Sequence, residues 1–416
     1  MKIPSQSSSI FFVLSIFLSF ALNIPIGAQS RPQRPDPPKG NEKRNERPKP
    51  KTPEELQKEA EEKARLEEEK NAIVIDDPLV IDTNIVNLDA VVINKKTGEV
   101  ITGLKKENFQ IFENGVKQEI SDFSTPDAPI TVTLLLEYSK WTEIFGRAAG
   151  GWDPGAYEAV RPVALFLSNF IKPPNDYASV VAFDIRPTPI TDFTNDPGRI
   201  RDTISILLRN RPAFQENNLF DALKFVLVGG RADSVVLERS ENEKSDYAGM
   251  MDVKAKRKAI ILVASGIDTF SKINYGDARK IIQEAGVPIY IISTGNLFYK
   301  RYEQYLDPAR TMPGQPDRLD FLQAKNIMNT FAKDSGGRHF EMTFESEIPD
   351  YLNSINALLR SQYSLSYDLA EKHVPGKKYK IEIKVDIDGD GLTDDKRFVV
   401  QHRPYIYTPE KKESKK

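Results

Sequence analysis

The chain contains no cysteine and only three histidines among its 416 residues. Without cysteine there can be no disulfide, no thiolate metal site and no cysteine nucleophile. The histidines, His339, His373 and His402, are scattered along the sequence, so a histidine-based catalytic or metal centre is not expected. The formal net charge is only -2, and the overall composition therefore gives no indication of binding to nucleic acid or to an anionic membrane surface.

Long apolar runs are also scarce, and the one that occurs lies near the N-terminus. Residues 10–22 are predominantly apolar, follow a single basic residue, Lys2, and end shortly before Pro25. The run is shorter than the roughly 20 residues that a membrane-spanning helix needs. It predicts a secretory signal peptide over residues 1–28, with an uncleaved anchor as the alternative. We therefore expect a secreted or periplasmic protein that has no membrane span after cleavage.

Hydrophobic periodicity then divides the remaining chain. Residues 29–72 are rich in proline and charge and predict a disordered spacer with a short polar helix, because they cannot bury enough apolar surface to offset ordering entropy. Residues 73–128 and 361–408 alternate apolar and polar side chains, as strands do. We expect these two segments to form the two parts of one small β-sandwich, followed by a basic tail over residues 409–416.

Between the two β segments, residues 129–360 show a different rhythm. Short apolar stretches alternate with amphipathic helical ones, and the strand candidates are "ITVTLLLEY", "YASVVAFD", "RKAIILVASG", "VPIYIISTG" and "GRHFEMTF", with "PITDFT" as an edge strand. Buried strands separated by helices are typical of a doubly wound, mostly parallel sheet with helices on both faces. The predicted fold is therefore α/β, inserted into the β-sandwich.

Several of these segments, in this order, resemble a known family. They are "VITGLKKENFQIFENGVKQEISDF", "LFDAL", "RKAIILVASGIDTFS", "GVPIYIIS", "DSGGRHF", "LRSQYSLSY" and "RPYIYTP". Together they resemble von Willebrand factor A (vWA) domain proteins, and more narrowly the secreted bacterial proteins called VWFA-related after their Acidobacteria examples. The resemblance covers about residues 85–409. It implies a non-enzymatic protein that makes adhesive or protein–protein contacts, with a metal-ion-dependent adhesion site at the carboxyl edge of the sheet.

The residues expected at that metal site match the family pattern poorly. The pattern has an aspartate and two serines on a first loop, a threonine on a second and an aspartate on a third. Here the first loop offers Glu137, Ser139 and Trp141, and the later positions fall on Asn217 and Ser265. Only Ser139 matches outright. The resemblance thus implies a degenerate site, and magnesium, which demands near-octahedral oxygen ligands, is not expected there.

Two alternatives to a lost metal site remain open at this stage. Asp268 lies three residues beyond Ser265 and could restore a charge if its loop were reshaped. Glu137, Ser139, Asn217 and Asp268 would then form a rebuilt magnesium site in a metal-dependent adhesin. Trp141, an aromatic residue at a strand end, is either a packing residue or an anchor for a partner.

A second candidate ion site is the stretch "DIDGDGLTDD", residues 386–395. Asp386, Asp388 and Asp390 alternate before a glycine, and Asp394 follows, as in short extracellular calcium loops. The bidentate glutamate of an EF-hand is missing, and Arg397 stands in its place. The alternative is an ordinary hairpin turn, because Asp-Gly is common in turns. We expect that a calcium ion, if bound here, has a structural role.

Catalytic motifs are absent from the sequence. It contains no G-x-S-x-G, no phosphate-binding G-x-x-x-x-G-K-[ST] and no G-x-G-x-x-G. The interpretation favoured by the sequence is a non-enzymatic, extracytoplasmic binding module that needs no cofactor and recognises a protein or another macromolecule, but not nucleic acid. An unrecognised extracytoplasmic hydrolase is the third alternative.

Overall fold

The computed structural model describes residues 85–139, 156–209, 214, 216–231, 246–305, 317–369 and 373–408. All of them belong to one compact unit, Val80–Lys416. The expected signal peptide, spacer and basic tail, and also Trp141, lie outside these residues. Among the helices described, none is long and apolar enough to cross a membrane.

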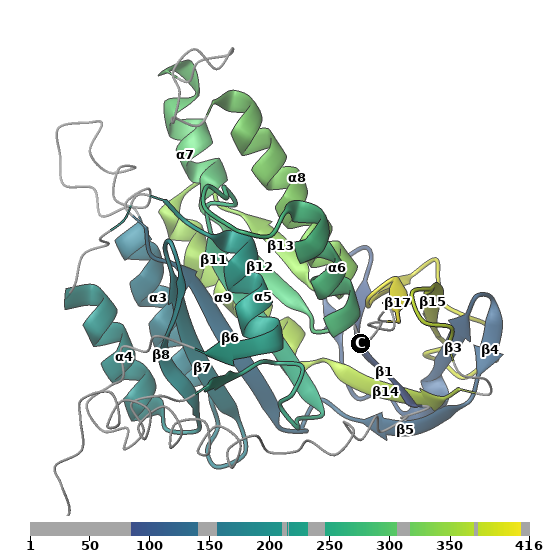
Figure 1. The fold of residues 1–416 in the computed structure, drawn as a ribbon. Coiled ribbons are helices and arrows are strands. Elements are labelled where there is room, and N and C mark those ends of the chain that lie inside the picture. The colour runs from purple at the N-terminus through teal and green to yellow at the C-terminus, as the bar shows by residue number, and fades with distance from the viewer. Residues whose placement is uncertain are drawn as a thin grey trace, which may run out of the picture. The chain divides into compact units, whose positions relative to one another are not determined.

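A six-stranded sheet forms the centre of the α/β unit (Figure 1). Its strand order is β13-β12-β11-β6-β7-β8, and every neighbouring pair is parallel except β7 and β8. The predicted mostly parallel sheet and its edge strand are therefore confirmed. The strands are β6 (Ile130–Glu137), β7 (Tyr177–Phe183), β8 (Pro187–Thr194), β11 (Arg257–Ala264), β12 (Ile289–Ser293) and β13 (Arg338–Glu341).

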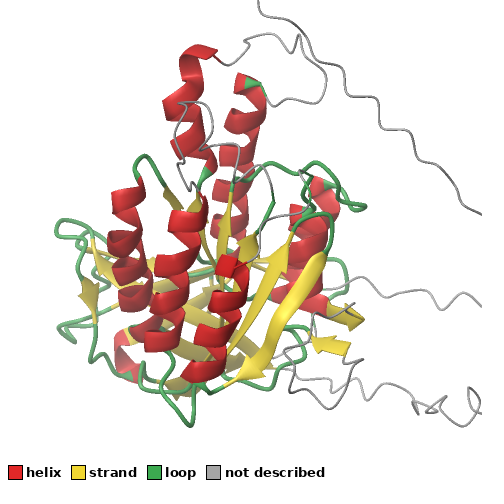
Figure 2. Cartoon of the chain, turned by 90° about the vertical axis from the view of Figure 1, so that its left-hand side faces the viewer, coloured by secondary structure: helices red, strands yellow, loops and turns green. Residues whose placement is uncertain are grey.

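Helices cover both faces of this sheet, as a doubly wound fold requires. Alternate side chains of β6 point to opposite faces, so Leu134 and Leu136 pack into one hydrophobic core and Leu135 into the other. The first core is completed by α3 (Ala156–Phe170), α4 (Pro197–Arg209) and α9 (Ile348–Arg360). The second is completed by α5 (Leu219–Val228), α6 (Tyr275–Ala285) and α8 (Arg318–Ser335). Figure 2 shows these helices lying along the strands.

The strands before and after the α/β unit pair with each other. β1 (Ile85–Asn94) lies between β14 (Tyr363–Asp368) and β16 (Phe398–Gln401), and β3 (Phe109–Glu113) pairs with β15 (Lys378–Val385). They form two sheets, ordered β16-β1-β14-β5 and β17-β15-β3-β4, which share one hydrophobic core. The remaining strands here are β2 (Val100–Ile101), β4 (Val116–Gln118), β5 (Ile120–Ser124) and β17 (Tyr405–Tyr407).

Some elements were not expected from the sequence. They are helix α7 (Gly295–Tyr302), the hairpin of β9 (Gly229–Arg231) and β10 (Asp246–Ala248), and three short 3-10 helices, η1 (Lys106–Asn108), η2 (Glu303–Tyr305) and η3 (Glu345–Glu347). The turn at Asn114-Gly115 joins β3 to β4. Both of its residues have positive φ, 47° and 84°, as a two-residue hairpin turn needs.

One buried side chain ties together the two connections between the α/β unit and the flanking strands. Arg257, at the start of β11, is 0% exposed. Its Nη1 donates hydrogen bonds to the carbonyls of Pro126 and Ala128, both at 2.6 Å, and its Nη2 donates to the carbonyl of Leu359. The first two carbonyls precede β6 and the third lies at the end of α9, so Arg257 joins the entering and the leaving segment.

Candidate functional site

Glu137 is the last residue of β6 and lies at the carboxyl edge of the central sheet, where ligands of open α/β folds usually bind. Its side chain is buried, with 2% exposed. Oε1 accepts hydrogen bonds from Ser139 Oγ and Asn217 Nδ2, each at 3.0 Å. Oε2 accepts from the backbone N–H of Ser265 at 2.6 Å. One carboxyl group therefore joins the loop after β6, the loop before α5 and the loop after β11.

Burial controls the protonation of this carboxyl group. Removal from water disfavours the charged form and raises the pKa of Glu137 above its ordinary value of 4.5. The hydrogen bonds from Ser265, Ser139 and Asn217 act in the opposite direction, but they do not outweigh desolvation. The carboxyl group of Glu137 is therefore placed to connect three loops through hydrogen bonds, and it is not a solvent-exposed group that a ligand could readily reach.

Asn217 supports the same arrangement from the second loop. It is fully buried, its backbone N–H donates to Thr269 Oγ1 at 2.8 Å, and its carbonyl accepts from the backbone N–H of Phe270 at 2.8 Å. Its Nδ2 faces Glu137, whereas its Oδ1 has no hydrogen-bond partner among the described residues. The amide is therefore held in place by the loop after β11 as well as by Glu137.

Asp268 does not join the Glu137 network. Its Oδ1 accepts hydrogen bonds from Ser271 Oγ at 2.5 Å and from the backbone N–H of Phe220 at 3.3 Å. Phe220 lies in the first turn of α5, where free N–H groups attract a carboxylate. Burial raises the pKa of Asp268 above its ordinary value. The structure thus uses Asp268 to cap a helix instead of completing a magnesium site.

These residues do not fit a magnesium ion. Magnesium prefers several hard oxygen ligands in near-octahedral geometry. Within the hydrogen-bond network described here, Glu137 is the only acid, and both of its oxygens already accept N–H or O–H donors. Asn217 presents its Nδ2 to the carboxylate, and Ser265 contributes its backbone N–H. These three donors take up most of the lone-pair sites of the carboxylate, and the network brings no second acid to it.

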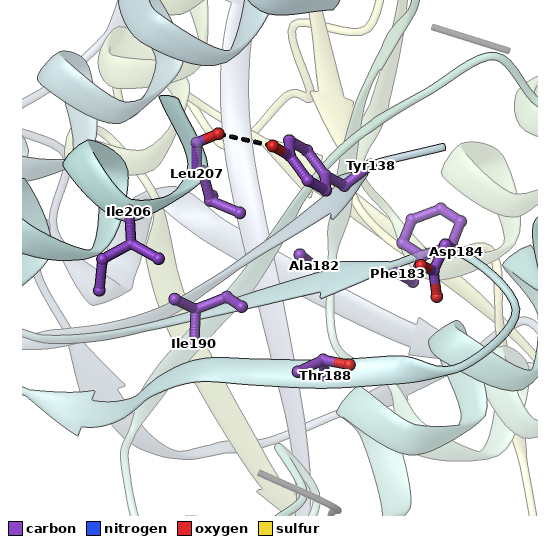
Figure 3. A pocket seen from close by; sticks show the side chains of 8 residues that line it. All are labelled: Tyr138, Ala182, Phe183, Asp184, Thr188, Ile190, Ile206 and Leu207. Carbon is purple, nitrogen blue, oxygen red and sulfur yellow. Dashed lines mark hydrogen bonds between the residues drawn. The ribbon is translucent and has the colours of Figure 1, made fainter. Parts of the chain in front are cut away.

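A cavity of about 200 Å³ lies at the carboxyl edge of the sheet, between the ends of β6 and β7, strand β8 and helix α4. Tyr138 directly follows Glu137, and its hydroxyl donates to the carbonyl of Leu207 at 2.6 Å, which closes one side (Figure 3). An apolar cavity of this size can hold one aromatic ring. The lining is mostly apolar and consists of Tyr138, Ala182, Phe183, Asp184, Thr188, Ile190, Ile206 and Leu207. Burial raises the pKa of the one acid in the lining, Asp184.

Exposed aromatic side chains occur on loops at the same edge. Phe214 lies three residues before Asn217, Phe270 follows β11 and Phe344 follows β13, and they are 43%, 53% and 65% exposed. Aromatic residues are frequent anchors of protein interfaces because they bury a large area with few rotamers to fix. The edge therefore combines a rigid polar centre with apolar contact groups.

The aspartate loop that follows β15 brings three of its predicted ligands together. Single carboxylate oxygens of Asp386, Asp388 and Asp394 lie within 4.8 Å of one another. Asp390 is not in this group, and its Oδ1 accepts from the backbone N–H of Leu392. Arg397 lies beside the group, with Nη1 3.4 Å from Asp394 and 4.0 Å from Asp388. The guanidinium supplies part of the positive charge that a calcium ion would supply.

Turn hydrogen bonds also engage these aspartates. Asp386 accepts from the backbone N–H groups of Gly389 and Gly391, and Asp394 accepts from that of Ile387. The remaining lone pairs of Asp386, Asp388 and Asp394 still suit a calcium ion, since its coordination is flexible. The calcium site therefore stays a prediction.

Sequence reasoning missed part of the site at the sheet edge. It treated Ser265 as the position of a lost charge, but the functional group there is the backbone N–H, whose direction a sequence does not reveal. It also missed the capping role of Asp268 and the cavity beside Tyr138. A signal for the capping role of Asp268 was the helical pattern that begins at Leu219. The first turn of a helix attracts an acid, but the sequence does not show which acid lies there.

Comparison with known proteins gives limited similarity. No protein-family model and no curated protein matches the chain. Similar solved structures include proximal thread matrix protein 1 from the mussel byssus, at 12% identity and a TM-score of 0.36, with 61% of this chain and 51% of that chain covered. They also include the PilB minor pilin from Streptococcus sanguinis, at 11% identity and a TM-score of 0.36, with 56% and 62% covered.

A third similar structure is the SpRpn10 VWA domain, at 11% identity and a TM-score of 0.32, with 54% of this chain and 94% of that domain covered. The chain thus spans about half the length of the byssus protein and about three-fifths of the pilin. This similarity is too low to support an argument about function.

Proposed function

We propose that this protein is an extracytoplasmic, non-enzymatic binding module that recognises a protein or another macromolecule through the carboxyl edge of a vWA-like sheet. The observation that carries the proposal is the Glu137 network. A single buried carboxyl group accepts donors from three loops, so the loops are held in place without a metal ion. A surface that is already ordered loses less entropy when it binds.

The contact groups at this edge support the same function. Phe214, Phe270 and Phe344 are exposed on loops at this edge, and the cavity beside Tyr138 is large enough for an apolar side chain. Among the described residues, the acids with raised pKa at this edge, Glu137, Asp184 and Asp268, are not arranged as a nucleophile and base pair. Recognition therefore accounts for the site better than catalysis does.

The rest of the chain suits a module of this kind. We propose that residues 1–28 direct export and that residues 29–72 hold the folded unit away from its point of attachment or release. In this arrangement the paired flanking strands are a β-sandwich into which the α/β domain is inserted. The narrower assignment to secreted VWFA-related proteins belongs to the same proposal. Mass determination of the mature N-terminus from an exporting host would test the processing step.

A peptide-display selection on the full chain, in the presence of EDTA, tests the binding function. We expect selected peptides to carry an aromatic or aliphatic anchor and to bind at least tenfold more weakly to a Phe270→Ser, Phe344→Ser double variant, a loss of about 1.4 kcal/mol. Leu392→Ser is the control, since Leu392 is 72% exposed but lies on the aspartate loop. The proposal would be contradicted by peptides that bind the double variant as tightly as the unmodified chain, or by peptides that bind only when magnesium is added.

Two alternative functions predict different results with the same protein and its selected peptides. A metal-dependent adhesin with a rebuilt site would lose its selected peptides in EDTA and recover them with magnesium. A hydrolase would turn over generic ester or glycoside substrates, and the Glu137→Gln variant would abolish that turnover. Neither behaviour is expected from the hydrogen bonds that surround Glu137.

We also propose that the loop formed by residues 386–395 binds calcium weakly and in a structural role. The support is the approach of Asp386, Asp388 and Asp394 to one another. Closely spaced carboxylates repel one another, and Arg397 is 65% exposed and balances them only in part. A calcium ion would relieve this repulsion without contributing to recognition at the sheet edge.

A further inference from the structure

The outer face of the sheet β17-β15-β3-β4 carries an unusual set of side chains. Along β15, Ile381, Ile383 and Val385 point into the shared core. The intervening residues point the other way, because side chains alternate along a strand. These outward residues are Lys378, Lys380, Glu382 and Lys384, all of which are charged and three of which are basic.

Aromatic side chains lie on both sides of this row of charges. In the antiparallel register, Lys378 lies opposite Tyr407 and Lys380 opposite Tyr405 on β17, while Glu382 lies opposite Phe112 on β3. Directly opposite residues share a face. Phe112 in turn lies opposite Lys117 on β4, which adds a fourth lysine to the same face. Three partly exposed rings thus alternate with four lysines.

The charges on this face do not cancel. Glu382 forms an ion pair with Lys380, and Asp395 lies 3.3 Å from Lys384. Within the described part of the chain, neither Lys117 nor Lys378 forms an ion pair, although Lys378 Nζ lies 3.6 Å from the centre of the Tyr405 ring. Four lysines against two acids leave two positive charges in excess on a chain whose net charge is -2.

We propose that this face binds an anionic polysaccharide. The ammonium groups of Lys117 and Lys378 would pair with acidic groups of the polymer, and the rings of Phe112, Tyr405 and Tyr407 would pack against its sugar rings. The tyrosine hydroxyls can donate to and accept from sugar hydroxyls. This surface is separate from the carboxyl edge of the α/β sheet, so its function does not depend on the one proposed above.

A nucleic acid fits this face less well. Proteins that bind nucleic acid concentrate more positive charge, because they must neutralise closely spaced phosphates. An excess of two charges suits a polymer with one acidic group on each sugar or fewer. The small excess of positive charge therefore favours the polysaccharide.

The test uses the full chain in EGTA and three probes, namely polygalacturonate, neutral dextran and a poly(dT) oligonucleotide. We expect saturable binding of polygalacturonate that weakens as salt is added, and no binding of dextran. A Lys117→Gln, Lys378→Gln double variant should bind at least tenfold more weakly. Tyr405→Ser should also weaken binding, since it removes a packing ring without changing the charge.

The matched control is Lys224→Gln with Lys333→Gln, two exposed lysines on α5 and α8 whose replacement changes the net charge equally. This control should bind as the unmodified chain does, and thermal melts should show that all variants fold. The proposal is overturned if polygalacturonate does not bind, if both double variants lose binding equally, or if poly(dT) binds more tightly than polygalacturonate.

Discussion

Replacing Glu137 with alanine should loosen three loops at once. The change leaves Ser139 Oγ, Asn217 Nδ2 and the backbone N–H of Ser265 without their common acceptor in a buried site. A buried donor left unpaired costs about 1–3 kcal/mol. The change also removes the cost of burying a carboxyl group, which is large enough to raise its pKa despite the hydrogen bonds from Ser265, Ser139 and Asn217. We therefore expect a net loss of about 2–4 kcal/mol in the free energy of unfolding.

Guanidinium unfolding of the full chain, in EGTA and with or without millimolar magnesium, measures this loss. EGTA prevents calcium from binding to the chain but leaves most of the magnesium free. Magnesium should not change the midpoint of the unmodified chain, because Glu137 is the only acid of its network and its oxygens already accept three donors. The reasoning would be refuted by a Glu137→Ala loss of less than about 0.5 kcal/mol, the usual range of surface changes, or by stabilisation of the unmodified chain by magnesium.

The pH dependence supplies an independent check with a defined sign. The folded pKa of Glu137 lies above its ordinary value of 4.5, so the folded state holds the proton more tightly. The associated stability is fully present below pH 4.5 and is lost as pH rises through the folded pKa. The unmodified chain should therefore lose stability relative to Glu137→Gln as the pH rises across this window. A parallel pH profile of the two proteins would contradict the assignment.

Four further predictions concern other parts of the molecule. Arg257→Leu leaves three carbonyls without their donors and should lower the free energy of unfolding by about 3–5 kcal/mol in denaturant titrations, since each buried group left unpaired costs about 1–3 kcal/mol. The adjacent Lys256→Gln breaks an exposed ion pair with Asp122 and should cost less than about 1 kcal/mol. Burial lowers the pKa of His339 to about 4, so the stability it contributes above pH 6.5 should be lost as pH falls towards 4, and a His339→Gln variant should show no such loss in thermal melts. Calcium should raise the melting temperature of the unmodified chain and leave that of an Asp386→Asn, Asp394→Asn variant unchanged, and equal shifts in both would exclude the loop as the site. Tyr247→Phe removes hydroxyl contacts with Thr133 and Ser179 and should cost about 1–2 kcal/mol in the same melts, with an unchanged midpoint counting against a role for this buried network.

The sequence predicted the central sheet well because its strands are continuous apolar runs. All residues from Ile130 to Glu137 are buried, which is the pattern of a strand covered on both faces. The prediction failed for α7 and for the β9–β10 hairpin. In β10 only Tyr247 is buried, so the short strand has no periodic pattern that a sequence could show. Its position depends instead on stacking between Tyr247 and the rings of Phe193 and Phe225.

The candidate site was predicted only as a set of residues. Glu137, Ser139 and Asn217 do meet, as the resemblance to vWA domains implied. The sequence could not show that the extra methylene of Glu137 would let its carboxylate reach the backbone of Ser265. Gly266, with a φ of 87°, follows that residue and turns the loop where most side chains would be strained. The direction of the Ser265 backbone N–H determines which group binds Glu137. That direction is set by the folded loop and not by the residue type.

The buried side chains of Glu137 and Arg257 limit how far a conformational change could regulate binding. A switch needs two states that a ligand distinguishes. Glu137 accepts hydrogen bonds from three loops at the sheet edge, and Arg257 fixes both segments that lead into and out of the α/β unit. Arg403 adds a further constraint, since its Nη2 donates to the carbonyl of Asn87 and its Nη1 lies where a side chain at Gly286 would begin. A protein built in this way should bind at all times, with affinity set by its contact surfaces rather than by a ligand-dependent change of state.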